Sequence, residues 1–112
     1  MEIRASVRND ALEHRALVST DGRVSSLPVP RKADGPGSSI NGAELLCLAL
    51  ATCYCNDLYR EAARRGLAIH EVEVDVVSEF GAVGEPARRI RYSARVASDA
   101  PAEAIAELLR AT

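Results

Sequence analysis

Residues 38–67 read SSINGAELLCLALATCYCNDLYREAARRGL, a run long enough to form the largest element of the chain. We predict one helix from about Gly42 to Arg65, capped by Asn41 or by one of the two serines before it. Gly66 is expected to end the helix in the left-handed conformation that glycine adopts at little cost. At 1.5 Å per residue this helix is about 36 Å long, roughly the width of a domain of this size.

The two halves of this helix differ in polarity. AELLCLALATCYC (43–55) is apolar around nearly its whole circumference, whereas NDLYREAARRG (56–66) has an apolar side and a charged side. A helix that is apolar all round must be buried all round. The few remaining elements offer too little material to do this, so we expect a second subunit to cover the first half, most simply in a two-fold dimer. A monomer would expose a stripe of leucine and cysteine that favours aggregation.

Strands are expected on both sides of the helix, where apolar and polar residues alternate. Before it, the expected strands are EIRASVRN (2–9), HRALVST (14–20) and RVSSLPVP (23–30). Thr20–Arg23 is a turn signal, so these strands should form a meander, and Pro28 and Pro30 should end the third. Residues 31–41 are expected to form a loop; they lack the Gly-Lys-Ser/Thr ending of a phosphate-binding loop.

After the helix, the pattern predicts a hairpin and a final helix. LAIHEVEVDVVSEF (67–80) alternates with a slip near Glu71, GAVGEP (81–86) is a turn signal, and RRIRYSARVAS (88–98) should pair back. Pro101 should start the final helix, with Asp99 as its cap. The order of elements predicts an α+β fold, and the length of 112 residues predicts one domain over residues 1–112.

Composition and charge exclude several classes of partner. Aromatic residues make up 4% of the chain, which disfavours base stacking and aromatic cages. Sixteen acidic and fourteen basic residues give a net charge of -2 without a large basic patch, so no nucleic acid is expected as a partner. The N-terminal sequence MEIRASVRND lacks the apolar run of a signal peptide, and no stretch approaches the ~20 apolar residues that span a bilayer. We expect a cytoplasmic protein with no membrane partner.

Three cysteines, Cys47, Cys53 and Cys55, lie within nine residues of the predicted helix. Cys53 and Cys55 face about 200° apart, so they cannot easily form a local disulfide or share a metal. Cys47 lies about 12 Å along the axis from Cys55, too far to bridge, so any disulfide must form across subunits or with an outside thiol. Reduced thiols are expected, with no cofactor and no metal. Each thiol has two interpretations: a small buried hydrophobic side chain, or a reactive group.

Cys53 lies in mid-helix, where the helix dipole contributes little to its thiolate. Asp57 lies one turn further on at about the same azimuth and disfavours that thiolate by its charge. Activation of Cys53 therefore requires a cation from elsewhere in the fold. His14 and His70 are expected to be solvated residues on strand faces, and the arginines after Cys55 are expected to form a solvated helix surface.

The stretch 38–67 resembles the helix of the OsmC/Ohr family of thiol peroxidases. In that family an Asn-Pro-Glu-x-Leu start precedes a catalytic Cys by about three turns, and the helix closes in Gly-Leu or Gly-Ile; Cys53 falls on the catalytic position. The resemblance implies an α+β OsmC-like fold: a strand meander, a long central helix, a β-hairpin and a short C-terminal helix. It also implies an interlocked homodimer with the two long helices between two sheets.

The chain departs from the family pattern at two places. Gly42 and Ala43 stand where the family has Pro-Glu, and Glu44 comes one position later, a rotation of about 100° on a helix. The family's second, resolving Cys belongs to the helix after the last strand, where residues 101–112 contain none. The resemblance assigns the activating arginine to Arg8, with Arg15 and Arg31 as rivals.

Two functions follow as hypotheses. In the first, the protein is a thiol-dependent peroxidase for organic or hydrogen peroxides in oxidative-stress defence, in which Cys53 becomes a sulfenic acid that an external thiol reduces. In the second, it is a non-enzymatic dimer of the same fold that binds a small apolar ligand, and Cys47, Cys53 and Cys55 belong to its core.

Overall fold

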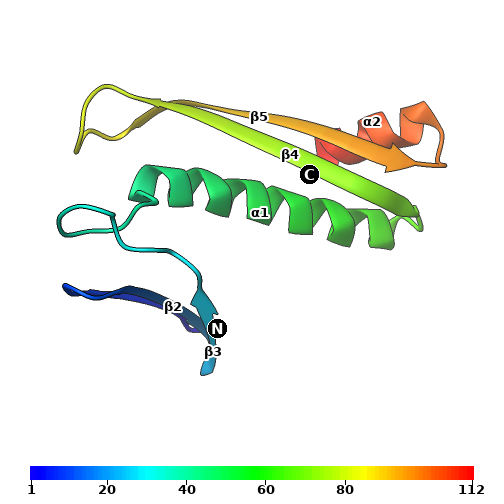
Figure 1. The fold of residues 1–112 in the computed structure, drawn as a ribbon. Coiled ribbons are helices and arrows are strands. Elements are labelled where there is room, and N and C mark those ends of the chain that lie inside the picture. Colours follow the sequence, from blue (N-terminus) through cyan, green and yellow to red (C-terminus); the bar gives the residue numbers. More distant parts are fainter. The chain divides into compact units, whose positions relative to one another are not determined.

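The computed structural model describes all 112 residues, Met1–Thr112, and has an α+β architecture in two compact units (Figure 1). Met1–Gly42 forms the first unit and Ala43–Thr112 forms the second. The elements are β1 (Ile3–Asn9), β2 (His14–Thr20), β3 (Arg23–Leu27), α1 (Gly42–Arg64), β4 (Ile69–Phe80), β5 (Ala87–Ser98) and α2 (Ala102–Ala111). Their order confirms the predicted fold class.

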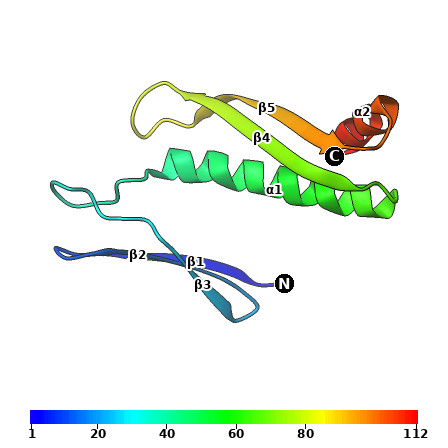
Figure 2. The same ribbon diagram turned by 45° about the vertical axis from the view of Figure 1, so that its right-hand side comes forward.

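The first unit contains an antiparallel sheet in the order β1-β2-β3, which confirms the predicted meander (Figure 2). Between β2 and β3, Asp21 (φ 47°) and Gly22 (φ 84°) both have positive φ. This is the pair of conformations that a two-residue hairpin turn requires, and Asp-Gly adopts it readily. The meander therefore forms where the turn signal predicted it.

The turn between β1 and β2 is organised by Asp10. Its Oδ1 atom accepts hydrogen bonds from the backbone N–H groups of Leu12 (2.8 Å) and Glu13 (2.9 Å). These two bonds hold the pKa of the Asp10 carboxyl below its usual value, with smaller contributions from the charges of Arg8 and Arg31. The carboxylate thus supplies the acceptor that closes the turn.

The segment after β3 forms the expected loop. Val29 is buried, and an isolated bridge joins Arg31 to Ser38. The Asn9 amide holds Gly37 twice: its Oδ1 accepts from the Gly37 N–H at 3.1 Å, and its Nδ2 donates to the Gly37 carbonyl at 3.0 Å. The end of β1 therefore fixes this loop within the first unit.

The helix α1 ends at the predicted position. Gly66 has φ 67°, and the N–H groups of Gly66 and Leu67 donate to the carbonyls of Ala63 (3.2 Å) and Ala62 (2.9 Å). This pair of bonds is a Schellman motif, in which the glycine takes the left-handed conformation. The motif reverses the chain into β4.

In the second unit, the antiparallel pair β4–β5 lies along α1 (Figures 1 and 2). The register shifts between Ile69 and Glu71, which confirms the predicted slip, and again between Val77 and Glu79, which the pattern did not predict. Three residues form the buried core: Leu58, Ala62 and Leu108. Half-buried hydrophobic residues pack around them: Tyr54, Leu67, Ile69, Val72, Val96, Ile105 and Leu109. The second half of α1 thus has its apolar side covered by the hairpin and α2.

The predicted cap of α2 is wrong. Pro101 occupies the N-cap position and the helix has no side-chain cap, so Asp99 lies two residues too early to serve it. Asp99 instead places Oδ2 3.0 Å from Nε2 of His70 at the start of β4. The carboxylate therefore ties the two ends of the hairpin together.

Candidate functional site

The three thiols differ in exposure along α1. All are free; Cys53 is exposed, whereas Cys47 and Cys55 are half-buried. Cys55 borders a cavity of about 240 Å³ between α1 and β4. Ala51, Thr52, Asn56 and Val74 complete its lining. Of the three thiols, Cys53, the nucleophile that the resemblance predicts, is therefore the most accessible.

The face of α1 that carries Cys53 is apolar on the N-terminal side of the cysteine and charged on its C-terminal side. Leu46 and Ala49 lie within about 40° of Cys53 in azimuth on its N-terminal side, and Asp57 and Arg60 lie within about 40° on its C-terminal side. All four are exposed. A substrate at Cys53 would therefore contact apolar side chains in one direction along the helix and charged side chains in the other.

Ion pairs organise the charged part of α1. Arg60 donates from Nη1 to Oδ1 of Asp57. One turn further on, Glu61 accepts from Arg64 (3.1 Å) and Arg65 (3.1 Å). These arginines form the solvated surface that was expected, and the pairing of Arg60 with Asp57 is the detail that sequence reasoning missed. The i, i+3 spacing of the two residues could have indicated it.

Arg8, the arginine assigned by resemblance, lies on β1 opposite Arg15. Its side chain is exposed and forms no hydrogen bond or ion pair. The two rivals are engaged elsewhere: Arg15 lies 3.7 Å from a Glu13 carboxylate oxygen, and Arg31 donates to the Gly35 carbonyl at 3.2 Å. Arg8 belongs to the first unit and the thiols belong to the second.

The other polar residues singled out from the sequence have structural partners. His14 is half-buried on β2, with Nδ1 3.1 Å from the Asn9 amide nitrogen, and His70 pairs with Asp99. Glu44 is exposed in the first turn of α1. No group of three or more His, Cys, Asp or Glu side chains is placed to hold a metal ion. Neither helix combines the length and apolar character needed to cross a bilayer.

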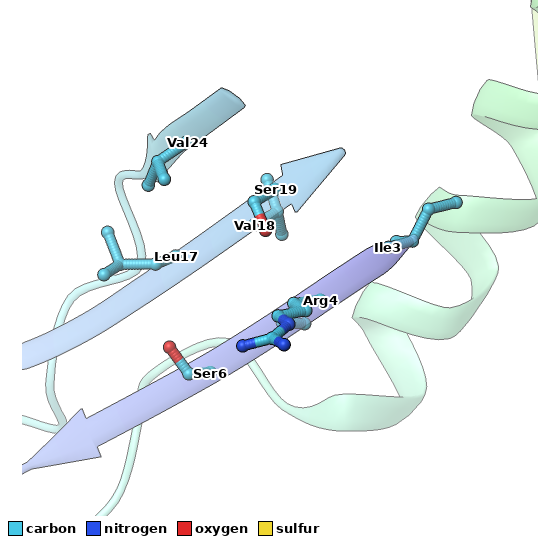
Figure 3. A pocket seen from close by; sticks show the side chains of 8 residues that line it. Ile3, Arg4, Ser6, Leu17, Val18, Ser19 and Val24 are labelled. Atoms are coloured by element: carbon cyan, nitrogen blue, oxygen red, sulfur yellow. The ribbon is translucent and has the colours of Figure 1, made fainter. Parts of the chain in front are cut away.

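A second hollow lies on the sheet of the first unit and was not predicted (Figure 3). It has a volume of about 540 Å³, and its lining comes from all three strands. The residues are Ile3, Arg4, Ala5, Ser6, Leu17, Val18, Ser19 and Val24. Arg4 is paired with Glu2 at 3.0 Å, and with two serines it makes the surface of the hollow about as polar as apolar.

Residues 35–112 match the family model for OsmC-like proteins. The chain belongs to the OsmC-like protein family. Its match with the uncharacterized protein YmaD of Bacillus subtilis (strain 168) is 31% identical over 68 residues, which covers 61% of this chain. The same match spans 43% of YmaD, so this chain aligns with less than half the length of that relative.

The crystal structure of an OsmC-like protein from Mycoplasma pneumoniae has the same fold as this OsmC-like chain. The TM-score is 0.67 at 15% sequence identity, over 97% of this chain and 77% of the other. The family and the α+β fold that the helix sequence predicted are thus confirmed.

Proposed function

We propose that this OsmC-like protein is a thiol-dependent peroxidase that reduces organic or hydrogen peroxides through Cys53, in defence against oxidative stress. The observation that carries the proposal is the exposure of Cys53, the residue that the helix resemblance assigns as the nucleophile. A thiol buried as a small hydrophobe would be inert, whereas an exposed thiol beside a cation can react as a thiolate. The likeness of fold over 97% of the chain supports a single OsmC-like domain over residues 1–112.

The proposed reaction begins with attack of the Cys53 thiolate on the outer oxygen of the peroxide. An S–O bond forms, the O–O bond breaks, and the leaving oxygen takes a proton to depart as an alcohol or water. The product is a sulfenic acid on Cys53. A first molecule of a small external thiol condenses with it and releases water, and a second molecule resolves the mixed disulfide. Two thiols are thus oxidised to a disulfide for each peroxide reduced.

Arg8 is the cation that we propose for this step. Its guanidinium is free of hydrogen bonds and ion pairs, so it is available to stabilise a thiolate and to orient a peroxide. No cofactor or metal is invoked, because the electrons come from the external thiol. The three free thiols also support a reducing compartment, and we propose the cytoplasm.

A homodimer is the second part of the proposal. Leu46 (44% exposed) and Leu48 (58% exposed) lie in the half of α1 that is apolar all round. Such side chains favour burial at an interface, and a two-fold contact supplies one with a single kind of subunit. We therefore propose that the first half of α1 lies in the dimer interface.

Regeneration should use either the external thiol or a cysteine of the symmetry mate. Cys55 is the nearest thiol in sequence, but it faces about 200° away from Cys53 on the same helix. A bridge between them would require α1 to unwind and to lose several backbone hydrogen bonds. Oxidation by a few equivalents of an organic hydroperoxide should therefore leave no intrachain disulfide. An intact mass two units lower, on a monomeric band in a non-reducing gel, would contradict this.

Peroxide consumption in the presence of dithiothreitol tests the proposed activity. Cys53→Ser should abolish consumption and keep the native circular dichroism spectrum, whereas Cys47→Ser, on the same helix, should keep the activity. Equal consumption by the wild-type chain and by Cys53→Ser would overturn the proposal.

The alternative function is a non-enzymatic dimer that binds a small apolar ligand, with the cysteines in its core. The replacement of the family's Pro-Glu by Gly42 and Ala43 favours it, because the acidic residue that fixes the activating arginine is absent from its usual position. In that case the wild-type chain would consume no peroxide, and a small apolar compound would raise the melting temperature.

A further inference from the structure

The ion pair beside Cys53 has a consequence for the reactivity of that thiol. Asp57 follows Cys53 by four residues, about 6 Å along the helix axis, and side chains on a helix lean towards its N-terminus. The Asp57 carboxylate therefore lies on the same face of α1 as the thiol, within about 40° in azimuth. Alone, this negative charge would disfavour the thiolate that must attack a peroxide.

Arg60 counters that charge in the structure. Its Nη1 donates to Oδ1 of Asp57, which places the guanidinium beside the carboxylate and on the same face of α1 as Cys53. We propose that the Asp57–Arg60 pair sets the reactivity of Cys53, and that Arg60 acts as a positioning residue by neutralising Asp57. The inference rests on the proposed role of Cys53 as nucleophile, although its test does not require peroxidase activity.

No other charged group of the second unit shares this role. Leu58 and Ala62, which pack against the hairpin and α2, lie about 140° and 180° around the helix from Cys53. The charged residues of β4, β5 and α2 therefore lie on the far side of α1 from the thiol.

On α1 itself, Glu44 lies about 180° around the helix from Cys53, and Glu61 and Arg65 lie about 80° and 120° from it. Arg64 shares the azimuth of Cys53 but lies about 16 Å along the axis.

The test is the rate at which iodoacetamide alkylates Cys53 in the full chain, followed between pH 6 and pH 9 by peptide mass spectrometry. Arg60→Met should slow alkylation at pH 7 by about twofold, the effect in water of removing one unit charge about 10 Å along the helix from the thiol. The pH at half-maximal rate should rise accordingly. Arg60→Lys should restore most of the rate, because an ammonium group also neutralises Asp57.

Two further variants separate this mechanism from a general charge effect. Arg64→Met removes an arginine that is paired with Glu61 at the same spacing, and it should leave the rate unchanged. Asp57→Asn should not slow alkylation, and adding Arg60→Met to it should have less effect than in the wild-type chain. In 1 M salt, the difference between Arg60→Met and the wild-type chain should shrink.

Equal rates for Arg60→Met and the wild-type chain would overturn the inference, as would equal slowing by Arg60→Met and Arg64→Met. Both arginines are exposed, so neither change should unfold the chain. Slower alkylation in Arg60→Met, together with no peroxide consumption by the wild-type chain, would uphold the ion-pair effect and overturn the peroxidase function. The two proposals can therefore fail separately.

Discussion

The two halves of α1 differ in how far the rest of the second unit buries them. Residues 43–55 are apolar around nearly the whole circumference of the helix, yet none of them is fully buried, and Leu46 and Leu48 are exposed. Residues 56–64 carry most of the charges of the helix, yet they contribute Leu58 and Ala62, which are buried. The hairpin and α2 thus cover the amphipathic half, and the apolar half is the one that needs another surface.

This difference shows that hydrophobicity alone does not indicate where the chain covers itself. The core forms where one apolar side of a helix meets apolar sides of other elements, as around Leu58. A helical segment that is apolar around nearly its whole circumference needs more contacting surface for its burial than the second unit provides. In our account that surface belongs to a second subunit.

The largest expected effect comes from Leu48→Asp. In an isolated chain this substitution would be mild, because Leu48 is exposed. In the proposed dimer it places an unpaired charge in an apolar interface, so it should abolish soluble expression of the dimer. Light scattering at micromolar concentration and the soluble yield would show this.

Asn56→Asp is the matched control, since it adds one negative charge to an exposed position in the second half of the same helix. It should leave both yield and mass unchanged. A stable, folded monomer of the wild-type chain at micromolar concentration would contradict the role that we assign to the first half.

The next largest effect is expected in the second half of α1, which the hairpin and α2 cover. Leu58→Ala removes a completely buried side chain and leaves a cavity, which should lower the free energy of unfolding by about 2–5 kcal/mol. Urea denaturation would measure the loss. Leu12→Ala, at a side chain that is 88% exposed, should change the free energy of unfolding by less than about 0.5 kcal/mol. Similar losses for the two variants would mean that the core does not lie around Leu58.

Tyr54 lies next to the boundary between the two halves of α1, and its substitution should have the smallest effect on the free energy of unfolding. Its hydroxyl donates to the Leu109 carbonyl at 3.2 Å, so Tyr54→Phe should lower the free energy of unfolding by about 1 kcal/mol at pH 7. Tyr59→Phe, at a more exposed tyrosine of the same helix, should have no measurable effect. Equal losses would show that the bond to Leu109 contributes nothing specific.

The same tyrosine predicts a dependence on alkaline pH. Burial raises the pKa of Tyr54 above its ordinary value, because the phenolate loses solvation. A group whose pKa is raised by folding contributes stability that is present below its unfolded pKa, about 10, and is lost as pH rises through the folded pKa. Thermal melts above pH 10 should therefore show a steeper loss in the wild-type chain than in Tyr54→Phe.

Most of the fold could be predicted from the sequence, because local signals agree with one another. Gly66 has the left-handed conformation that was predicted for it, and Asp21 and Gly22 form the predicted hairpin turn. The slip in the alternating pattern near Glu71 corresponds to a register shift between β4 and β5. The cap at Asp99 failed because local spacing did not reveal that the carboxylate would meet His70, 29 residues away in the chain. Such pairings depend on tertiary structure.

The candidate site could be predicted less completely. The helix pattern located Cys53, and its exposure appeared only in the structure, because the apolar sequence around it also suits a buried thiol. The pairing of Asp57 with Arg60 follows from helical spacing and could have been anticipated, whereas the hollow on the first sheet depends on side chains that three strands bring together.

The order in which the three thiols react tests the central claim most directly. Limited iodoacetamide treatment of the native protein, followed by peptide mapping, gives a rate for each cysteine. We predict that Cys53 reacts first, ahead of the half-buried Cys47 and Cys55. Faster labelling of Cys47 or Cys55, or labelling of Cys53 only after unfolding, would leave the proposed peroxidase without its nucleophile.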